Sequence, residues 1–131
     1  EDMESEGWGR MIAISSTAGL KGYSYVSAYC ASKHAVIGLT RSLAMELAKK
    51  GITVNSVCPS YIDTPMTERT IANITKLTNL SSVDAIQELV SSNPQKRLIL
   101  PSEVAETILW LCKDTSNSIN GQSISIAGGE I

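Results

Sequence analysis

The sequence contains no phenylalanine, one histidine and only 5% aromatic residues among its 131 positions. Its three cysteines, Cys30, Cys58 and Cys112, are odd in number and far apart. This argues against a disulfide framework and predicts reduced thiols in a cytoplasmic protein. No apolar run approaches the ~20 residues that span a bilayer, and the acidic start at 1–7 is unlike a signal peptide. We therefore expect neither membrane insertion nor export.

The sequence also has no large excess of either charge, since 11 basic and 13 acidic residues leave a net charge of -2. A chain without a basic field is not expected to bind nucleic acid or anionic lipid, so small molecules and protein subunits are the expected partners. With 43% apolar residues the chain is long enough for one globular domain. It begins with Glu1 and not with methionine, which leaves open that it is a piece of a longer protein.

Three apolar runs without alternation predict strands at 10–16, 52–60 and 122–129, each buried on both faces of a parallel sheet. Helices are predicted between them. One would carry a stripe of small and apolar residues and stop at Gly51. The other would cover 101–114, with Ser102 as its N-cap. The order of elements predicts an α/β fold with a doubly wound parallel sheet. The first helix's stripe comprises Ala28, Ala31, Ala35, Leu39, Leu43 and Leu47, of which the leucines are expected in the core. The second helix is expected to turn Val104, Ile108 and Leu111 inward.

The segment 64–100 interrupts this plan with short helical signals, including Ser81 and Asp84 at the spacing of a capping box. Because it follows the carboxyl end of a strand, it is expected to be a helical lid over a substrate. Packing in an ordinary subdomain is an equal alternative.

Tyr29 and Lys33 are four residues apart on the predicted first helix, and so lie on one face. A nearby ammonium favours the phenolate form of a tyrosine and makes it more able to transfer a proton at neutral pH. Ser16, at the carboxyl end of the first strand, could orient a carbonyl oxygen. Taken alone, the spacing is more often structural, with Tyr29 in the core and Lys33 in solvent.

The longer pattern "GRMIAISSTAG" followed by "YCASKHAVIGLTRSLAMELAKKGITVNSVCPSYIDTPM" resembles the C-terminal half of the short-chain dehydrogenase/reductase family. A serine stands thirteen residues before Y-x-A-S-K, and N-x-x-x-P then precedes T-P-M. The resemblance covers nearly the whole chain. It implies a Rossmann-like fold, NAD or NADP as cofactor and a homodimer or homotetramer that packs through the first helix.

By the same resemblance, Ser16 would orient the substrate carbonyl and Tyr29 would exchange a proton with its oxygen. Lys33 would stabilise the phenolate and hold the nicotinamide ribose. The cofactor-binding residues would be Tyr29 and Lys33 with Pro59, Ser60, Ile62 and Thr64, whereas Asn55 would be structural.

The match departs from the family at Ser60, where glycine is usual, and at Ala127 and Ala13. The sequence also contains no G-x-x-x-G-x-G turn of the kind that receives a pyrophosphate. We therefore expect three strands with flanking helices, forming the C-terminal half of a single domain, with the nucleotide-binding half outside residues 1–131. A metal or thiolate site at Cys30 and His34 is not expected, because no third ligand stands at a useful spacing.

The substrate pocket is expected at Ala18, Val26 and Met66. Family members that grip a small carboxylate use basic residues at the first two positions, so a neutral or bulkier ketone is favoured here, such as a 3-oxoacyl thioester of fatty acid metabolism. A 3-hydroxybutyrate dehydrogenase remains an alternative, because the lid has a similar length. A noncatalytic half-domain that acts only in assembly is the second alternative.

Overall fold

The computed structural model describes residues 2–131, so the expectation that concerned Glu1 lies outside the described residues. Three parallel strands form one sheet: β1 (Gly9–Ile14), β2 (Ile52–Pro59) and β3 (Ser123–Ile126). The central strand is β2, which places Ile52 opposite Gly9 of β1 and Pro59 opposite Ile126 of β3. The predicted parallel sheet is confirmed, with strands somewhat shorter than the apolar runs.

Burial differs between the strands. Every residue of β2 is buried, as predicted. In contrast, β1 is an edge strand among residues 2–131 and leaves Met11 37% and Ile14 48% exposed. The residues of β3 are half-buried. The expectation of burial on both faces is therefore wrong for β1 and β3 within this chain, because the helices on the two faces pack mainly against the central strand.

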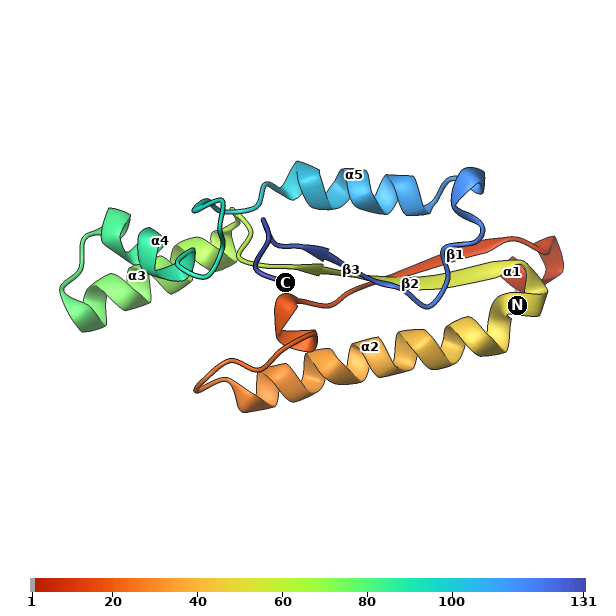
Figure 1. Cartoon of the computed structure of the whole chain (residues 1–131), viewed down its shortest axis with the longest axis horizontal. Coiled ribbons are helices and arrows are strands. Elements are labelled where there is room, and N and C mark those ends of the chain that lie inside the picture. Colours follow the sequence, from red (N-terminus) through yellow and green to blue (C-terminus); the bar gives the residue numbers. More distant parts are fainter. Residues whose placement is uncertain (1) are drawn as a thin grey trace.

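Two long helices cover opposite faces of the sheet (Figure 1). On one face, α2 (Ser27–Leu47) packs Ala44 against Ile52 and Val54 of β2. On the other, α5 (Pro101–Leu111) packs Val104 and Leu111 against Val57, with Ile108 at the margin. The helix–sheet–helix layering confirms the predicted doubly wound α/β class. The single turn η2 (Ala48–Lys50) ends α2 at Gly51, whose φ of +72° suits glycine.

The inward face of α2 was predicted wrongly in part. Leu39 is 61% exposed, and Ala28, Ala31 and Ala35 are exposed with it. Only Leu43 and Leu47 of the predicted stripe reach the core cluster. Small residues satisfy a helical period on either face, so the period alone could not show which face meets the sheet. The residues that α2 buries are Cys30, Ile37, Thr40 and Ala44.

The N-cap of α5 was also predicted wrongly. The helix begins at Pro101 and its N-cap is Leu100, not Ser102. The carboxylate of Glu103 accepts a hydrogen bond from the Leu100 N–H at 2.7 Å, and it also pairs with Arg97. Proline suits the first helical position because its missing N–H would have had no partner there. A carboxylate from the first turn therefore caps this end of the helix, through the Leu100 N–H and not through the later N–H groups that a serine N-cap would bind.

The predicted helical segment contains α3 (Pro65–Thr78) and α4 (Ser82–Leu89), which project beyond the end of the sheet (Figure 1). As predicted, Ser81 caps α4, its Oγ accepting from the Asp84 N–H at 3.1 Å. The remaining elements are α1 (Asp2–Glu6), η1 (Thr17–Gly19) and η3 (Asp114–Ser116). Over residues 2–131, no helix combines the length and apolar character that crossing a membrane requires.

Candidate active site

Lys33 links the start of α2 to the carboxyl end of β1. Its Nζ donates to the carbonyl oxygen of Ile14 at 3.1 Å and lies 5.6 Å from the centre of the Tyr29 ring. Tyr29 is 49% exposed, one helical turn before Lys33. The structure thus brings the predicted tyrosine and lysine together, with the phenol accessible and the ammonium held by a backbone carbonyl.

Ser16 lies in the loop that joins β1 to α2. It is the N-cap of η1, and its Oγ accepts a hydrogen bond from the Ala18 N–H at 3.1 Å, which leaves the hydroxyl proton for another acceptor. This loop is fixed against α2, because Ser15 Oγ donates to the Lys33 carbonyl oxygen at 3.0 Å. Ser16 therefore sits on a short turn tied directly to the helix that carries Tyr29.

The four further cofactor candidates follow the central strand. Pro59 ends β2, and the Ser60 N–H donates to Ile126 O at 3.1 Å. Ile62 forms an isolated parallel bridge with Ile99, whose hydrogen bonds use the Tyr61 carbonyl and the Asp63 N–H. Thr64 is the N-cap of α3. These residues line the carboxyl edge of the sheet, where open α/β folds place their sites.

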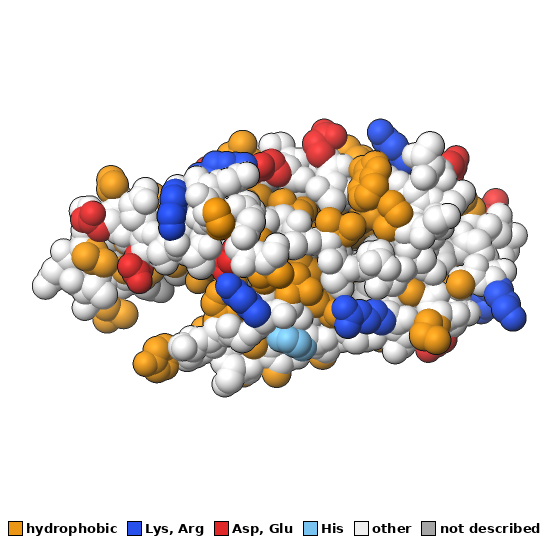
Figure 2. Space-filling model, in the orientation of Figure 1, with side chains coloured by type: hydrophobic (Ala, Val, Ile, Leu, Met, Phe, Trp, Pro, Cys, Tyr) orange, Lys and Arg blue, Asp and Glu red, His pale blue; other side chains and the backbone are white. Residues whose placement is uncertain are grey.

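The predicted pocket residues are spread more widely. Ala18 is buried at 4% exposure, whereas Val26 is 42% and Met66 78% exposed. Val26 precedes α2 and Met66 is on α3, and Figure 2 shows an open notch between the start of α2 and the projecting α3–α4 segment. The structure therefore places Val26 and Met66 on separate segments at this end of the molecule, and Ala18 beneath the surface.

The sequence analysis missed Glu130. Its side chain is 1% exposed and is held by groups from three separate segments, including the Oγ of Ser60. Burial opposes its ionisation, but hydrogen bonds from Tyr23, Lys21, Ser60 and Ser92 outweigh this and lower the pKa of the carboxyl to about 2. No periodic pattern marks such a residue; the only signal was an acid directly after Gly128 and Gly129.

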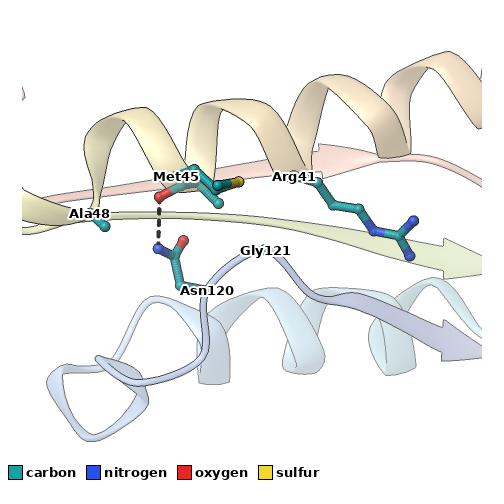
Figure 3. A pocket seen from close by; sticks show the side chains of 6 residues that line it. Arg41, Met45, Ala48, Asn120 and Gly121 are labelled. Carbon is teal, nitrogen blue, oxygen red and sulfur yellow. Dashed lines mark hydrogen bonds between the residues drawn. The ribbon is translucent and has the colours of Figure 1, made fainter.

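A surface depression lies away from these residues. It has a volume of about 350 Å³ and is lined by Arg41, Ala44, Met45, Ala48, Asn120 and Gly121 (Figure 3). These residues belong to the C-terminal half of α2 and the loop before β3, away from Tyr29. The Asn120 side chain spans its base, donating to Ala44 O at 3.0 Å. Because Arg41 is its only charged lining residue, the depression does not supply proton-transfer chemistry.

Among residues 2–131, no three histidine, cysteine or acidic side chains lie close enough together to hold a metal ion. His34 Nδ1 lies 2.9 Å from the carbonyl oxygen of Cys30, one turn back on α2. All three cysteines are free thiols.

Comparison with known proteins supports the fold described above. The family model described as enoyl-(acyl carrier protein) reductase matches residues 1–130. A D-beta-hydroxybutyrate dehydrogenase of Rhizobium meliloti is 38% identical over 97% of this chain, and an acetoacetyl-CoA reductase of Cupriavidus necator is 36% identical over 98%. The crystal structure of F189W actinorhodin polyketide ketoreductase with NADPH superimposes with a TM-score of 0.90 at 36% identity, over 98% of this chain.

The chain spans about half the length of these relatives. It covers 50% of the hydroxybutyrate dehydrogenase, 48% of the acetoacetyl-CoA reductase and 49% of the ketoreductase.

Proposed function

The chain belongs to the short-chain dehydrogenase/reductase family, and from this premise we propose that it is the catalytic half of an NAD- or NADP-dependent oxidoreductase that interconverts a ketone and a secondary alcohol. One observation carries the proposal: the Lys33 ammonium lies 5.6 Å from the ring of an accessible Tyr29, at the carboxyl end of a parallel strand. A cation beside a phenol there can assist proton transfer to a bound carbonyl.

In the reducing direction, the Tyr29 hydroxyl donates its proton to the carbonyl oxygen of the substrate. The Lys33 ammonium stabilises the phenolate that remains, and the free Ser16 hydroxyl proton hydrogen-bonds to the same substrate oxygen as negative charge develops on it. A bound nicotinamide cofactor supplies the hydride. In the oxidising direction, Tyr29 takes the proton back from the alcohol.

The residues after β2 suit such a cofactor. The bridge between Ile62 and Ile99 uses neighbouring backbone groups, so the Ile62 amide is available for a carboxamide. A serine at position 60, where the family usually has glycine, is compatible with a cofactor beside this turn, because the Ser60 Oγ is held by Glu130 Oε2 at 2.7 Å. We propose that Lys33, Pro59, Ser60, Ile62 and Thr64 hold the nicotinamide side of the cofactor.

We further propose that residues outside this chain provide the nucleotide-binding half and pair with β1. Two observations support this: the exposed edge residues Met11 and Ile14, and the half-length match to the relatives. The intact mass of the purified protein, measured under denaturing conditions, is expected near twice 14.0 kDa. A mass of 14.0 kDa, together with no binding of NADH or NADPH in a fluorescence titration, would instead leave a noncatalytic half-domain.

For the substrate, we propose a ketone that carries no free carboxylate beside the reacting carbon, such as a 3-oxoacyl thioester. The support is that Ala18 and Val26 are uncharged, so a buried carboxylate at these positions would have no ionic partner. The acetoacetyl-CoA reductase of Cupriavidus necator is one relative of this kind. The similarity to the hydroxybutyrate dehydrogenase of Rhizobium meliloti supports 3-hydroxybutyrate as the alternative substrate.

The substitution Val26→Lys tests this assignment. Val26 is 42% exposed and accepts a longer side chain without repacking the core. An ion pair between the new ammonium and the substrate carboxylate would contribute about 1 kcal/mol to binding, and so is expected to lower the KM for 3-hydroxybutyrate about fivefold. Steady-state kinetics would measure it, with Val26→Met as the control of similar length and no charge. Equal KM values for the two variants would show that Val26 does not face the substrate.

Two other features complete the proposal. Leu39 and Met45 are 61% and 83% exposed on α2, which supports a homodimer or homotetramer formed through this helix. The free thiols of Cys30, Cys58 and Cys112 support a reducing compartment, and we propose the cytoplasm.

A further inference from the structure

Glu130 has an unusual environment for a carboxylate. Although its side chain is only 1% exposed, Lys21 Nζ lies 2.9 Å from Oε1. The hydroxyls of Ser60 and Ser92 donate to its two oxygens at 2.7 and 2.9 Å, and the Tyr23 hydroxyl donates to Oε1 as well. A buried carboxylate is costly unless it is paired and hydrogen-bonded, and this one has four partners.

The four partners come from three segments that are distant in sequence. Lys21 and Tyr23 belong to the loop between β1 and α2, which also carries Ser16. Ser60 follows β2 in the turn that leads to the cofactor candidates. Ser92 follows α4 at the base of the projecting segment. Glu130 is therefore a common acceptor for three segments: the loop that contains Ser16 (the catalytic loop), the turn that contains Ser60 (the cofactor turn) and the base of the projecting α3–α4 segment, which we take as the lid in this proposal.

A tight turn at Gly128 and Gly129 directly precedes Glu130 and positions it. Gly128 has φ +59° and Gly129 φ +94°, conformations that other residues rarely adopt. A Cβ on Gly128 would lie 2.2 Å from Oδ1 of Asn93, the neighbour of Ser92. The Asn93 side chain is itself fixed, donating to Arg97 O at 2.9 Å. The turn at these two glycines thus fits closely against the base of the lid.

The titratable groups around Glu130 are consistent with a carboxylate that stays ionised. Tyr23, Lys21 and Tyr61 are the titratable groups beside it. Burial and the hydrogen bond to Glu130 raise the pKa of Tyr23, so its phenol stays protonated and remains a donor. The single hydroxyl proton of Tyr23 goes to Glu130, so the Thr17 hydroxyl, 2.8 Å away, donates to the Tyr23 oxygen and carries the network to the residue after Ser16.

We propose that Glu130 is a positioning residue, which holds the catalytic loop, the cofactor turn and the base of the lid in fixed relation for the reaction. The inference rests on the proposed function for its kinetic consequences, but not for its structural ones. Ser60 supports it further, because a glycine at that position, the usual residue of the family, would have no hydroxyl to reach Glu130.

The test is Glu130→Gln in the complete protein, since glutamine keeps the shape but cannot pair ionically with Lys21. Hydrogen–deuterium exchange is expected to rise together in residues 16–25, 60–64 and 90–99. With NADPH or NADH and acetoacetyl-CoA, the KM values are expected to rise about 10- to 100-fold through misplaced binding groups, while kcat stays within about threefold because Ser16, Tyr29 and Lys33 are intact.

Two control variants sharpen the test. Ser92→Ala removes only the link to the lid, so faster exchange is expected in 90–99 alone. Glu103→Gln removes another paired carboxylate, at the start of α5, and is expected to affect exchange there without raising either KM.

The inference is overturned if exchange in Glu130→Gln rises only at 127–131, or if the protein melts earlier with unchanged KM values, which would mean a purely structural role. A wild-type protein that reduces no ketone would refute the proposed function instead. In that case the exchange pattern by itself still decides whether Glu130 joins the three segments.

Discussion

Replacing Tyr29 by phenylalanine is expected to lower kcat for ketone reduction by about 10²- to 10⁴-fold, the usual contribution of a positioned proton donor. The KM values are expected to change little, because the ring that lies 5.6 Å from Lys33 Nζ is kept and only the hydroxyl is lost. Because Tyr29 is 49% exposed, the change should leave the melting temperature within a degree or two. The measurement is NADPH or NADH oxidation with acetoacetyl-CoA by the complete protein.

The matched control is Tyr25→Phe. Tyr25 lies four residues before Tyr29 and is fully exposed, so removing its hydroxyl is expected to leave kcat unchanged. If Tyr29→Phe keeps more than about a third of the wild-type kcat, Tyr29 is not the proton donor, since losses of that size lie below the range for general acid catalysis.

The sequence predicted the elements that depend on strong local patterns. The central strand is a continuous apolar run, and the structure buries all of it. Gly51 ends the long helix as expected, in a left-handed conformation. Asn55, predicted to be structural, is 1% exposed and binds Ile119 O and the Gln122 N–H. For the strand and for Gly51 a short run or a single residue was sufficient, because the determining physics is local, whereas the role of Asn55 was implied by the family resemblance and its partners lie 64 and 67 residues away.

Two of the three wrong or missing predictions have a tertiary cause. Leu39 is exposed although it fits the helical period, because the period does not identify which face a sheet will cover. Glu103, and not Ser102, caps the start of α5, because its longer side chain reaches back from inside the helix to accept from the Leu100 N–H. The role of Glu130 could not be predicted, because its four partners come from distant parts of the sequence. Tertiary contacts decide the cases of Leu39 and Glu130, and local propensity does not encode them, whereas the contact between Glu103 and the Leu100 N–H is local.

The same distinction applies to the site. Tyr29 and Lys33 could be placed on one face from their spacing alone, since both belong to a single helix. The contact between Lys33 and the carbonyl of Ile14 required the helix to pack on the sheet. Local sequence thus supplied the chemical groups, whereas the packing of α2 on β2 set their position at the carboxyl edge.

Stability of that packing is expected to depend strongly on Leu111. It is 1% exposed at the end of α5 and belongs to the core cluster with Val57, Ile99 and Val104. Leu111→Ala removes buried methyl groups and leaves a cavity, so the free energy of unfolding is expected to fall by about 2–5 kcal/mol. Urea denaturation of the complete protein, followed by circular dichroism, would measure the loss.

The control for this prediction is Leu109→Ala, on the same helix at 57% exposure. It makes the same chemical change and alters helix propensity equally, so the difference between the variants isolates burial. A change within about 0.5 kcal/mol is expected for Leu109→Ala, as for ordinary surface positions. Equal losses in the two variants would mean that α5 does not pack on the sheet through Leu111. The carboxyl edge that carries Ile62 and Thr64 would then lack the support argued above, because Ile99, the bridge partner of Ile62, belongs to the same cluster.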